Sequence, residues 1–225
     1  MLREKMASWR FERGLAALSS SDLVAIQNYR GADWPSPQTP ASEAPFLALD
    51  FELDGLRKAA HILQAGWVPF AGRSIAMGKA VSLDIRSYAE LDAEAVTIHG
   101  IGEQRASQGE PVAEVLASLI EAMSGRIMVA HAAGIEQSVL QRAAKKLFGV
   151  HLPIRMVCTL TLERHLNPNL VGPEAYRLPT ARKRYGLPDY AAHDALTDAI
   201  AAAELLQAQL SRLSPETTLA DLERG

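Results

Sequence analysis

Strand-like segments come first in the chain. Residues 46–52 form a nearly continuous apolar run that ends in acids, which is typical of a buried strand. Residues 61–70 and 73–81 are predicted as two further strands around Ala71-Gly72, which together would form an antiparallel hairpin. Shorter candidate strands follow at 126–130 and 155–159.

Helical spacing of apolar residues is found mainly in the second half of the chain. It is clearest in 111–123, where apolar residues recur at i, i+3, i+4, i+7, i+8 and i+11. Three early strands followed by alternating helices and strands predict an α/β fold with a mixed sheet flanked by helices. Helical patterns are also found over 1–30, 135–148, 178–185 and 194–210.

Prolines separate a central domain from an N-terminal segment. Four prolines occur between Trp34 and Phe46, and proline suits neither a helix interior nor a central strand. The predicted organisation is an N-terminal helical extension over 1–33, a proline-rich linker over 34–45, one domain over 46–211 and a C-terminal tail over 212–225.

The composition is that of a globular protein. The chain has 225 residues, of which 48% are hydrophobic and 22% charged. Its single cysteine excludes an internal disulfide and favours a reducing compartment. No apolar run approaches the ~18 residues needed to cross a bilayer, and the charged start does not resemble a signal peptide. We therefore expect a cytoplasmic protein without a membrane partner.

Two acids stand at the end of the first predicted strand. Asp50 and Glu52 are two residues apart, so their side chains leave the same face of the strand. At ~4 Å and an effective dielectric constant of ~20, two such charges repel each other by about 4 kcal/mol. Either one acid is protonated, or a cation lies between them, or the strand end is solvated and both acids are hydrated.

Glu136 and Asp198 each lie on the apolar stripe of a predicted helix. A charged group on a buried face needs a partner, and a metal ion is one. For Glu136 the alternative is a first-turn charge favoured by the helix dipole. His193 can approach Asp198 if it lies in a loop that precedes an N-cap at Asp194.

These four acids and the histidine suit one kind of chemistry. Two divalent cations held by carboxylates activate a water and stabilise the leaving oxygen in phosphodiester cleavage, and a histidine would be the general base. The net charge of −3 argues mildly against a polyanionic partner. Two bound divalent cations would change that charge from −3 to +1 (−3 + 4), so nucleic acid is not excluded.

Taken in order, these segments resemble the DEDDh 3′–5′ exonucleases, a superfamily that includes the proofreading epsilon subunit of bacterial DNA polymerase III and ribonuclease T. The strongest match is 193–199 (HDALTDA), which has the family's His, four residues, then Asp. The resemblance covers residues 46–208 and implies a ribonuclease H-like fold. The other matching segments are 49–56 (LDFELDGL), 97–101 (TIHGI), 129–136 (VAHAAGIE) and 177–187.

The resemblance also implies roles for individual residues. Asp50, Glu52, Glu136 and Asp198 would be ligands of two Mg²⁺ or Mn²⁺ ions, and His193 would deprotonate the attacking water. Glu136 stands where the family usually has Asp, and its side chain is one methylene longer. The second ion could therefore be displaced or weakly held.

Substrate contacts are less sharply indicated. The backbone after the first motif is expected to line the pocket for the terminal nucleotide. Arg182 belongs to a basic cluster that either meets phosphates or is a solvated face, and His131 is either structural or close to the substrate. The candidate substrate-binding residues are Leu53, Asp54, Gly55, Leu56, His131 and Arg182.

The sequence thus predicts a Mg²⁺- or Mn²⁺-dependent exonuclease that acts on nucleic acid 3′ ends, with single-stranded DNA preferred as substrate. It would release nucleoside 5′-monophosphates. One alternative is an oligoribonuclease or RNA 3′-trimming enzyme; another is an inactive ribonuclease H-like module that only binds nucleic acid or protein. The N-terminal helices are the expected site for a protein partner. The motifs do not distinguish DNA from RNA, and the oligomeric state is left open.

Overall fold

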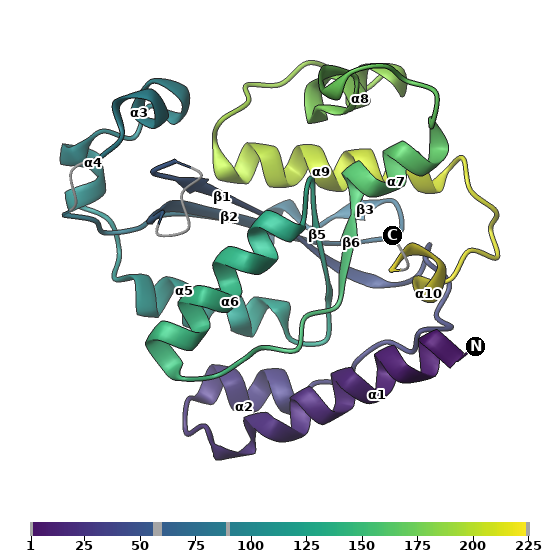
Figure 1. Cartoon of the computed structure of the whole chain (residues 1–225), viewed down its shortest axis with the longest axis horizontal. Helices are drawn as coiled ribbons and strands as arrows, with labels where there is room; N and C mark the ends of the chain where they lie inside the picture. The colour runs from purple at the N-terminus through teal and green to yellow at the C-terminus, as the bar shows by residue number, and fades with distance from the viewer. Residues whose placement is uncertain (1, 56–59, 89–90, 224–225) are drawn as a thin grey trace.

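The computed structural model describes residues 2–55, 60–88 and 91–223, and one mixed sheet lies at its centre (Figure 1). The strands are β1 (Pro45–Leu53), β2 (Ile62–Ala71), β3 (Ser74–Ile75), β4 (Val81–Asp84), β5 (Ile127–Ala130) and β6 (Met156–Cys158). Their order is β3-β2-β1-β5-β6, and β4 also pairs with β2. β1 is antiparallel to β2 and parallel to β5, which is parallel to β6. The predicted α/β class with a mixed sheet is confirmed.

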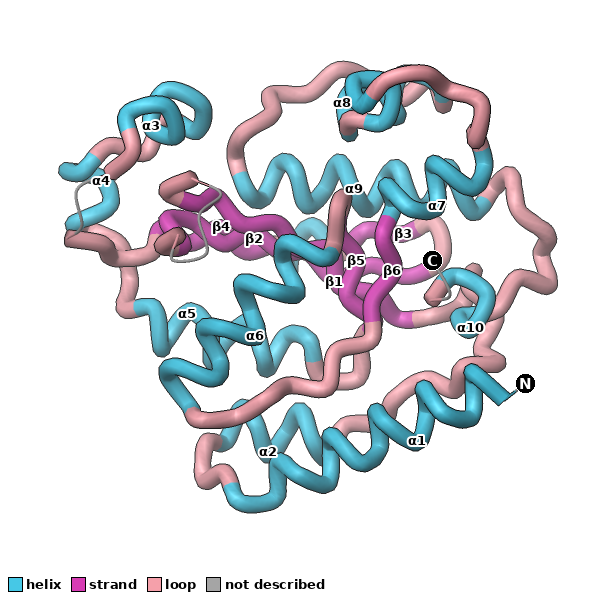
Figure 2. The backbone as a smooth tube through the Cα atoms, viewed as in Figure 1, coloured by secondary structure: helices cyan, strands magenta, loops and turns pink. Residues whose placement is uncertain are grey.

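Helices cover both faces of the sheet. They are α1 (Leu2–Ala17), α2 (Val24–Gly31), α3 (Ala93–His99), α4 (Glu103–Ser107), α5 (Val112–Met123), α6 (Gly134–Phe148), α7 (Thr159–Leu166), α8 (Leu178–Arg184), α9 (Ala195–Leu210) and α10 (Leu219–Leu222). Figure 2 shows α7, α8 and α9 on one face, and α5 and α6 on the other, with α1 and α2 outside them. The four helices expected after residue 110 are all confirmed. Sequence patterns had not indicated α3, α4, α7 or α10.

Alternate residues of β1 face the two helical layers. Phe46 and Ala48 are fully buried in a core shared with α9, whereas Leu47 and Leu49 are buried in a core shared with α5 and α6. This alternation follows from the two-residue period of a strand. Asp50 is the next residue in the row that faces α9. The strand therefore carries its first acid toward that helix.

The second strand of the predicted hairpin is shorter than expected. Residues 73–81 contain only β3 and a 3₁₀ turn (Met77–Lys79), and β4 begins at the end of this range. Pro69 of β2 has no amide hydrogen to donate, and its carbonyl instead accepts from the Ala76 amide at 2.9 Å. The ladder is interrupted there, and β4 resumes pairing with β2 farther along. The prediction of one continuous strand was wrong for this reason.

The helical pattern over 1–30 is divided into α1 and α2 by a turn at consecutive serines. Serine side chains compete for backbone hydrogen bonds, and the Ser21 hydroxyl accepts from the Leu23 amide at 3.4 Å. Phe11 and Ile26 are buried in the same core as α5, and the Tyr29 hydroxyl donates to the Pro153 carbonyl at 2.7 Å. The N-terminal helices are therefore packed onto the central domain.

The segments expected to be a linker and a tail lie side by side. The Ala41 amide donates to the Thr217 carbonyl at 2.8 Å, and the Leu219 amide donates to the Thr39 carbonyl at 3.0 Å. Leu219 of α10 is fully buried in the α9-facing core. The domain boundaries themselves stay predictions. No helix in the described ranges has the length and apolar character to span a membrane.

Candidate active site

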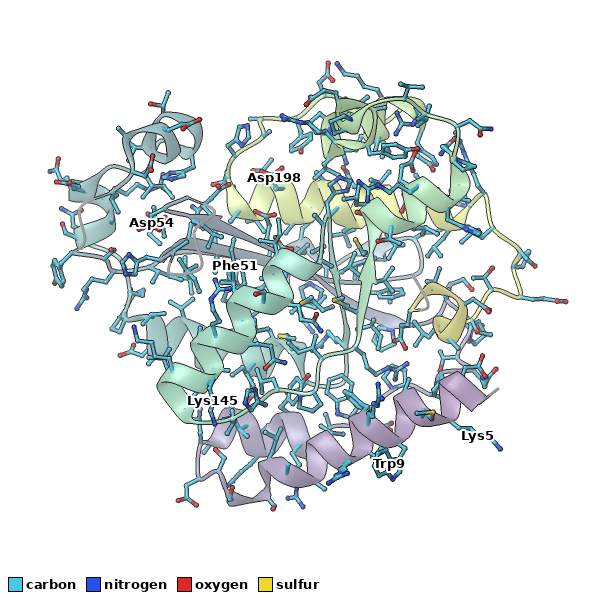
Figure 3. All side chains as sticks on the ribbon, viewed as in Figure 1. Lys5, Trp9, Phe51, Asp54, Lys145 and Asp198 are labelled. Carbon is cyan, nitrogen blue, oxygen red and sulfur yellow. The ribbon has the colours of Figure 1, made fainter. Side chains whose placement is uncertain are left out.

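Three carboxylates meet where β1 ends beneath the first turn of α9. Asp50, Glu52 and Asp198 each offer an oxygen, and these oxygens all lie within 4.8 Å of one another. Figure 3 shows Asp198 on α9 next to the end of β1 that carries Phe51 and Asp54. The strand supplies two acids on one face, and the helix that packs on this face supplies the third.

The site strongly favours either protons or a cation. Burial raises the pKa of Asp50 well above its usual range, and the carboxylates of Glu136 and Asp198 raise it further. Burial also raises the pKa of Glu52 to about 7, with added repulsion from Asp198 and Asp194. A divalent cation would remove this repulsion, because hard cations take carboxylate oxygens as ligands. The interpretation of a fully solvated strand end is wrong.

Glu136 lies beside this cluster, in the first turn of α6. Its side chain is only 5% exposed, and burial raises its pKa to about 8. Its charge would raise the pKa of Asp50, so the two carboxyl groups are close enough to interact. Its Oε2 atom is buried and has no hydrogen-bond partner among the described residues. Glu136 does not belong to the three-carboxylate cluster, but it presents a free oxygen donor at the cluster's margin.

The loop before α9 brings the backbone of His193 to Asp198. The His193 amide donates to Asp198 Oδ2 at 2.7 Å, and the backbone at His193 has a φ of 71°. Asp194 caps the helix, as expected, because its Oδ1 atom accepts from the Thr197 amide at 3.0 Å. The His193 side chain is exposed. It is therefore accessible to solvent at the site's rim.

Tyr190 is a residue of this site that sequence reasoning missed. Its hydroxyl donates to Asp198 Oδ1 at 2.7 Å, and burial is the main reason that the pKa of Tyr190 is raised. The Arg182 guanidinium lies 4.9 Å from the Tyr190 ring centroid. Tyr190 lies in a loop, where no hydrophobic period could single it out.

Arg182 is buried and bonded within the protein, and the phosphate-binding role expected for it stays a prediction. Its side chain is 3% exposed and donates to the Ala201 carbonyl at 2.9 Å, to Glu204 at 2.6 Å and to the Pro188 carbonyl at 3.1 Å. These contacts tie α8 to α9 and hold the loop that precedes Tyr190. Arg182 thus stabilises the arrangement of α8, α9 and the loop that carries Tyr190.

His131 is likewise bonded within the protein, at both ring nitrogens, and its assignment as a substrate-binding residue stays a prediction. One ring nitrogen lies 2.9 Å from the Thr159 hydroxyl and the other 2.9 Å from the Tyr176 carbonyl. Burial lowers the pKa of His131 to about 4. Both nitrogens are occupied within the protein, which favours the structural one of its two expected roles.

The segment after β1 turns sharply at the edge of the site. The pairing register shifts between Glu52 and Leu53, and Gly55 has a φ of 112°. Asp54 is 2% exposed and accepts from the His61 amide at 2.7 Å, so its side chain ties the end of β1 to the residue before β2. A substrate role for the backbone of 53–55 stays a prediction. Leu56 lies outside the described residues.

Comparison with known proteins identifies the family. The model of the RNase_T exonuclease family matches residues 47–206, and the chain belongs to this family. This membership places the domain among the nucleases, which are hydrolases that act on nucleic acid. The matched region includes all four acids, His193 and Tyr190.

Two curated relatives are much longer than this chain. A Mycobacterium tuberculosis protein whose name describes it as a bifunctional exonuclease/endonuclease is 25% identical over 208 residues, which is 89% of this chain and 31% of that protein. The PolC-type DNA polymerase III of Caldanaerobacter subterraneus subsp. tengcongensis is 27% identical over 172 residues, which is 76% of this chain and 12% of that protein. The chain thus spans less than a third of either relative.

The fold matches that of solved exonuclease I structures. The zinc-bound form of the Escherichia coli exonuclease I complex with single-stranded DNA superposes with a TM-score of 0.66 and 19% identity, over 76% of this chain and 41% of that chain. A second exonuclease I structure gives a TM-score of 0.67 over 80% of this chain and 43% of that chain, also at 19% identity. These matches confirm the ribonuclease H-like fold that the sequence resemblance implied.

Proposed function

We propose that this chain is a metal-dependent 3′–5′ exonuclease domain that removes nucleoside 5′-monophosphates from single-stranded 3′ ends. The observation that carries the proposal is the group of Asp50, Glu52 and Asp198, whose oxygens lie within 4.8 Å of one another in a member of an exonuclease family. Single-stranded DNA is the first substrate to test, because exonuclease I of the same fold has been solved in complex with it.

The donor set fits two hard divalent cations, Mg²⁺ or Mn²⁺. Asp50, Glu52 and Asp198 provide a compact oxygen cluster, and the buried, unpartnered Oε2 of Glu136 provides a further donor. When bound, such cations lower the pKa of a water and stabilise the leaving oxygen in phosphodiester cleavage. Without them the raised pKa of Asp50 favours its protonated form, so cation binding would release protons.

His193 is the residue proposed to accept the proton of the attacking water. Its amide donates to Asp198 while its ring is exposed, so the loop fixes the backbone of His193 at the cluster and leaves the imidazole in solvent. Tyr190 and the His193 amide each donate to one oxygen of Asp198 and thereby orient this carboxylate. Replacement of His193 by Ala should lower kcat by ~10²–10⁴-fold, which is the usual contribution of a positioned base.

The proposal is tested with a single-stranded DNA oligonucleotide labelled at its 5′ end. The expected result is a ladder that shortens by single nucleotides in Mg²⁺ or Mn²⁺ and is absent in EDTA, with nucleoside 5′-monophosphates as the small products. The matched control is Asp50→Asn, which removes a charge with little change in shape. A wild-type protein that binds the oligonucleotide but leaves it intact in both metals would contradict the proposal and favour the binding module.

The preference between DNA and RNA needs a separate comparison. Matched single-stranded DNA, single-stranded RNA and duplex substrates are digested side by side under one set of metal concentrations. We expect the highest kcat/KM on single-stranded DNA. A preference for short RNA would instead identify an oligoribonuclease or RNA-trimming enzyme.

A protein contact through the N-terminal helices is also proposed. Trp9 is 59% exposed and Met6 48% exposed on α1, and Figure 3 shows Trp9 and Lys5 pointing away from the domain. Because the chain spans only part of its longer relatives, this surface is a candidate for contact with a further domain or a partner protein.

A further inference from the structure

Two residues of β2 lie directly across from the acids of β1. In the antiparallel register Gly66 pairs with Asp50, and Gln64 pairs with Glu52. These two β2 residues are on the face of the sheet that packs against α9, as their contacts with that helix establish. Neither carries a group that could perform the reaction. Both nevertheless lie beside the acids of β1 and contact the beginning of α9, the helix that supplies Asp198.

Gly66 allows the first turn of α9 to rest on the backbone of β2. A Cβ atom at this position would lie 2.1 Å from the Leu196 nitrogen and 2.2 Å from the Ala195 carbonyl carbon. Both of these are backbone atoms, so no side-chain rotation could relieve the overlap. Any side chain larger than hydrogen would move the beginning of α9 away from the sheet.

Gln64 holds the same turn through a hydrogen bond. Its side chain is 2% exposed, and its Oε1 atom accepts from the Ala195 amide at 2.9 Å. Its Nε2 atom donates to Asp84 Oδ1 at 3.1 Å and to Asp194 Oδ2 at 3.4 Å. Because an ionised carboxylate only accepts, Asp84 and Asp194 select the amide orientation that points Oε1 at α9.

Asp84 is itself fixed from the opposite side. Arg105 of α4 donates to both of its oxygens, from Nε at 2.6 Å and from Nη2 at 2.7 Å. A bidentate pair of this kind restricts both partners to one geometry. A continuous chain of hydrogen bonds therefore runs from α4 through Asp84 and Gln64 to the Ala195 amide, which is the first amide of α9.

We infer that Gln64 and Gly66 are positioning residues that set the placement of Asp198 against Asp50 and Glu52. Only the expected effect on catalysis rests on the proposed function; the placement of the first turn of α9 does not. Asp198 lies in the first turn of α9, and its amide donates to the Asp194 carbonyl at 2.9 Å, so it moves with that turn. Farther along, α9 is anchored independently by buried residues such as Ala203 and Leu206. Changes at β2 should thus shift the first turn while the rest of the helix stays in place.

Gly66→Ala is the variant that displaces the turn. Crystal structures of metal-free wild type and variant should show α9 residues 195–198 moved away from β2. Electron paramagnetic resonance should show Mn²⁺ affinity reduced by ~10–100-fold, and kcat should fall by about 10²-fold at a nearly unchanged KM. Gly78→Ala is the matched control, because a Cβ there meets nothing within 4 Å, and it should resemble wild type.

Gln64→Leu is the second variant, and it removes the hydrogen bond without adding a clash with the backbone. Hydrogen exchange of the Ala195 amide in the metal-free protein should accelerate at least ~10-fold, because its acceptor is lost. Mn²⁺ affinity should fall as in Gly66→Ala. Val68→Ala is the control for general weakening of the core, since Val68 is buried in the same α9-facing core. It should leave exchange at Ala195 and Mn²⁺ affinity unchanged.

The outcomes separate this inference from the proposed function. If wild type neither binds Mn²⁺ nor cleaves, the proposed function fails. The crystal structures and the exchange rates still decide whether Gln64 and Gly66 set the position of the first turn of α9. An unmoved first turn in Gly66→Ala overturns the inference. If Gly66→Ala does not fold, Gln64→Leu decides. The inference is then overturned if this variant keeps the wild-type exchange rate at Ala195 and the wild-type Mn²⁺ affinity.

Discussion

Buried carboxylates occur in two regions of this protein, and their surroundings are opposite. Glu163 of α7 is fully buried, yet it accepts from Arg184 Nε at 2.9 Å, from the Tyr185 hydroxyl at 2.8 Å and from two side-chain amides. Asp50 at the end of β1 is half-buried, and it faces other acids, among them the buried Glu52 and Glu136. Among the described residues, no basic side chain forms an ion pair with Asp50, Glu52 or Glu136.

The difference separates a structural acid from a functional one. The cost of burying the charge of Glu163 is offset within the chain by a guanidinium and neutral donors. Asp50, Glu52 and Glu136 have no such compensation among the described residues, so they hold protons or need a cation from solution. In this protein, a group of acids that lacks basic partners is therefore the better indication of a metal site than burial alone.

Asp50→Asn should have the largest effect of any single change at the acidic cluster. We expect kcat to fall by at least ~10³-fold, because the substitution removes a metal ligand. The metal-free fold should become no less stable, since asparagine is neutral like the protonated form of Asp50 that its raised pKa favours. Thermal unfolding in EDTA and in Mn²⁺ checks both parts. If Mn²⁺ stabilises wild type and variant equally, Asp50 is not a ligand.

Glu163→Gln tests the opposite region. A glutamine offers a single acceptor oxygen and turns an amide group toward donors that already surround the site, leaving the Arg184 charge uncompensated. We expect the free energy of unfolding to fall by about 3–5 kcal/mol, measured by urea denaturation. Mn²⁺ affinity of the folded variant should match wild type. A large loss of Mn²⁺ affinity would show that the two regions are not independent.

The pH dependence of stability should differ between the metal-free protein and the protein with bound metal. Burial raises the pKa of Glu52 to about 7 and that of Glu136 to about 8, from a usual value of 4.5. The folded metal-free protein thus keeps protons that the unfolded chain releases, so the contribution of these two groups to stability is greatest below pH 4.5 and is lost as pH rises through 7 to 8. We expect Tm in EDTA to drop by at least about 4 °C between pH 5 and pH 8.5, measured by calorimetry.

Saturating Mn²⁺ should remove most of this difference, because the ion replaces the protons. Glu52→Gln is the control variant, and its Tm in EDTA should vary less with pH than that of wild type. A wild-type Tm in EDTA that rises steadily from pH 5 to pH 8.5 would contradict the raised pKa values.

Glu136→Asp should have the smallest effect. The change keeps the charge and restores the residue usual in the family, but it shortens the reach by about one C–C bond, and metal–oxygen distances tolerate only ~0.2 Å of error. We expect activity within about tenfold of wild type, with part of the deficit recovered in Mn²⁺. Glu136→Ala is the comparison and should lose most activity. An active enzyme that Glu136→Ala leaves unchanged would mean that Glu136 is only a first-turn helix charge.

Local patterns in the sequence were sufficient for much of the fold. The continuous apolar run in β1 and the 3.6-residue spacing in α5 depend on residues close together in the chain, and both elements are confirmed. The same period places Asp50 and Glu52 on one face before any tertiary contact is considered. The turn that divides α1 from α2 and the interruption at Pro69 were missed, because overall helical or apolar character does not locate such breaks.

The sequence by itself determined most of the larger elements, the two acids on one strand face and the anomaly of acids on apolar helix stripes. Only the tertiary structure decided that Asp198 meets Asp50, that Tyr190 binds Asp198 and that Arg182 and His131 point inward. These outcomes depend on packing between segments far apart in the chain, which no local period encodes. The contact of Gly66 with the backbone of α9 is of the same kind: the sequence shows only a glycine in a strand, and the packed helix supplies its reason.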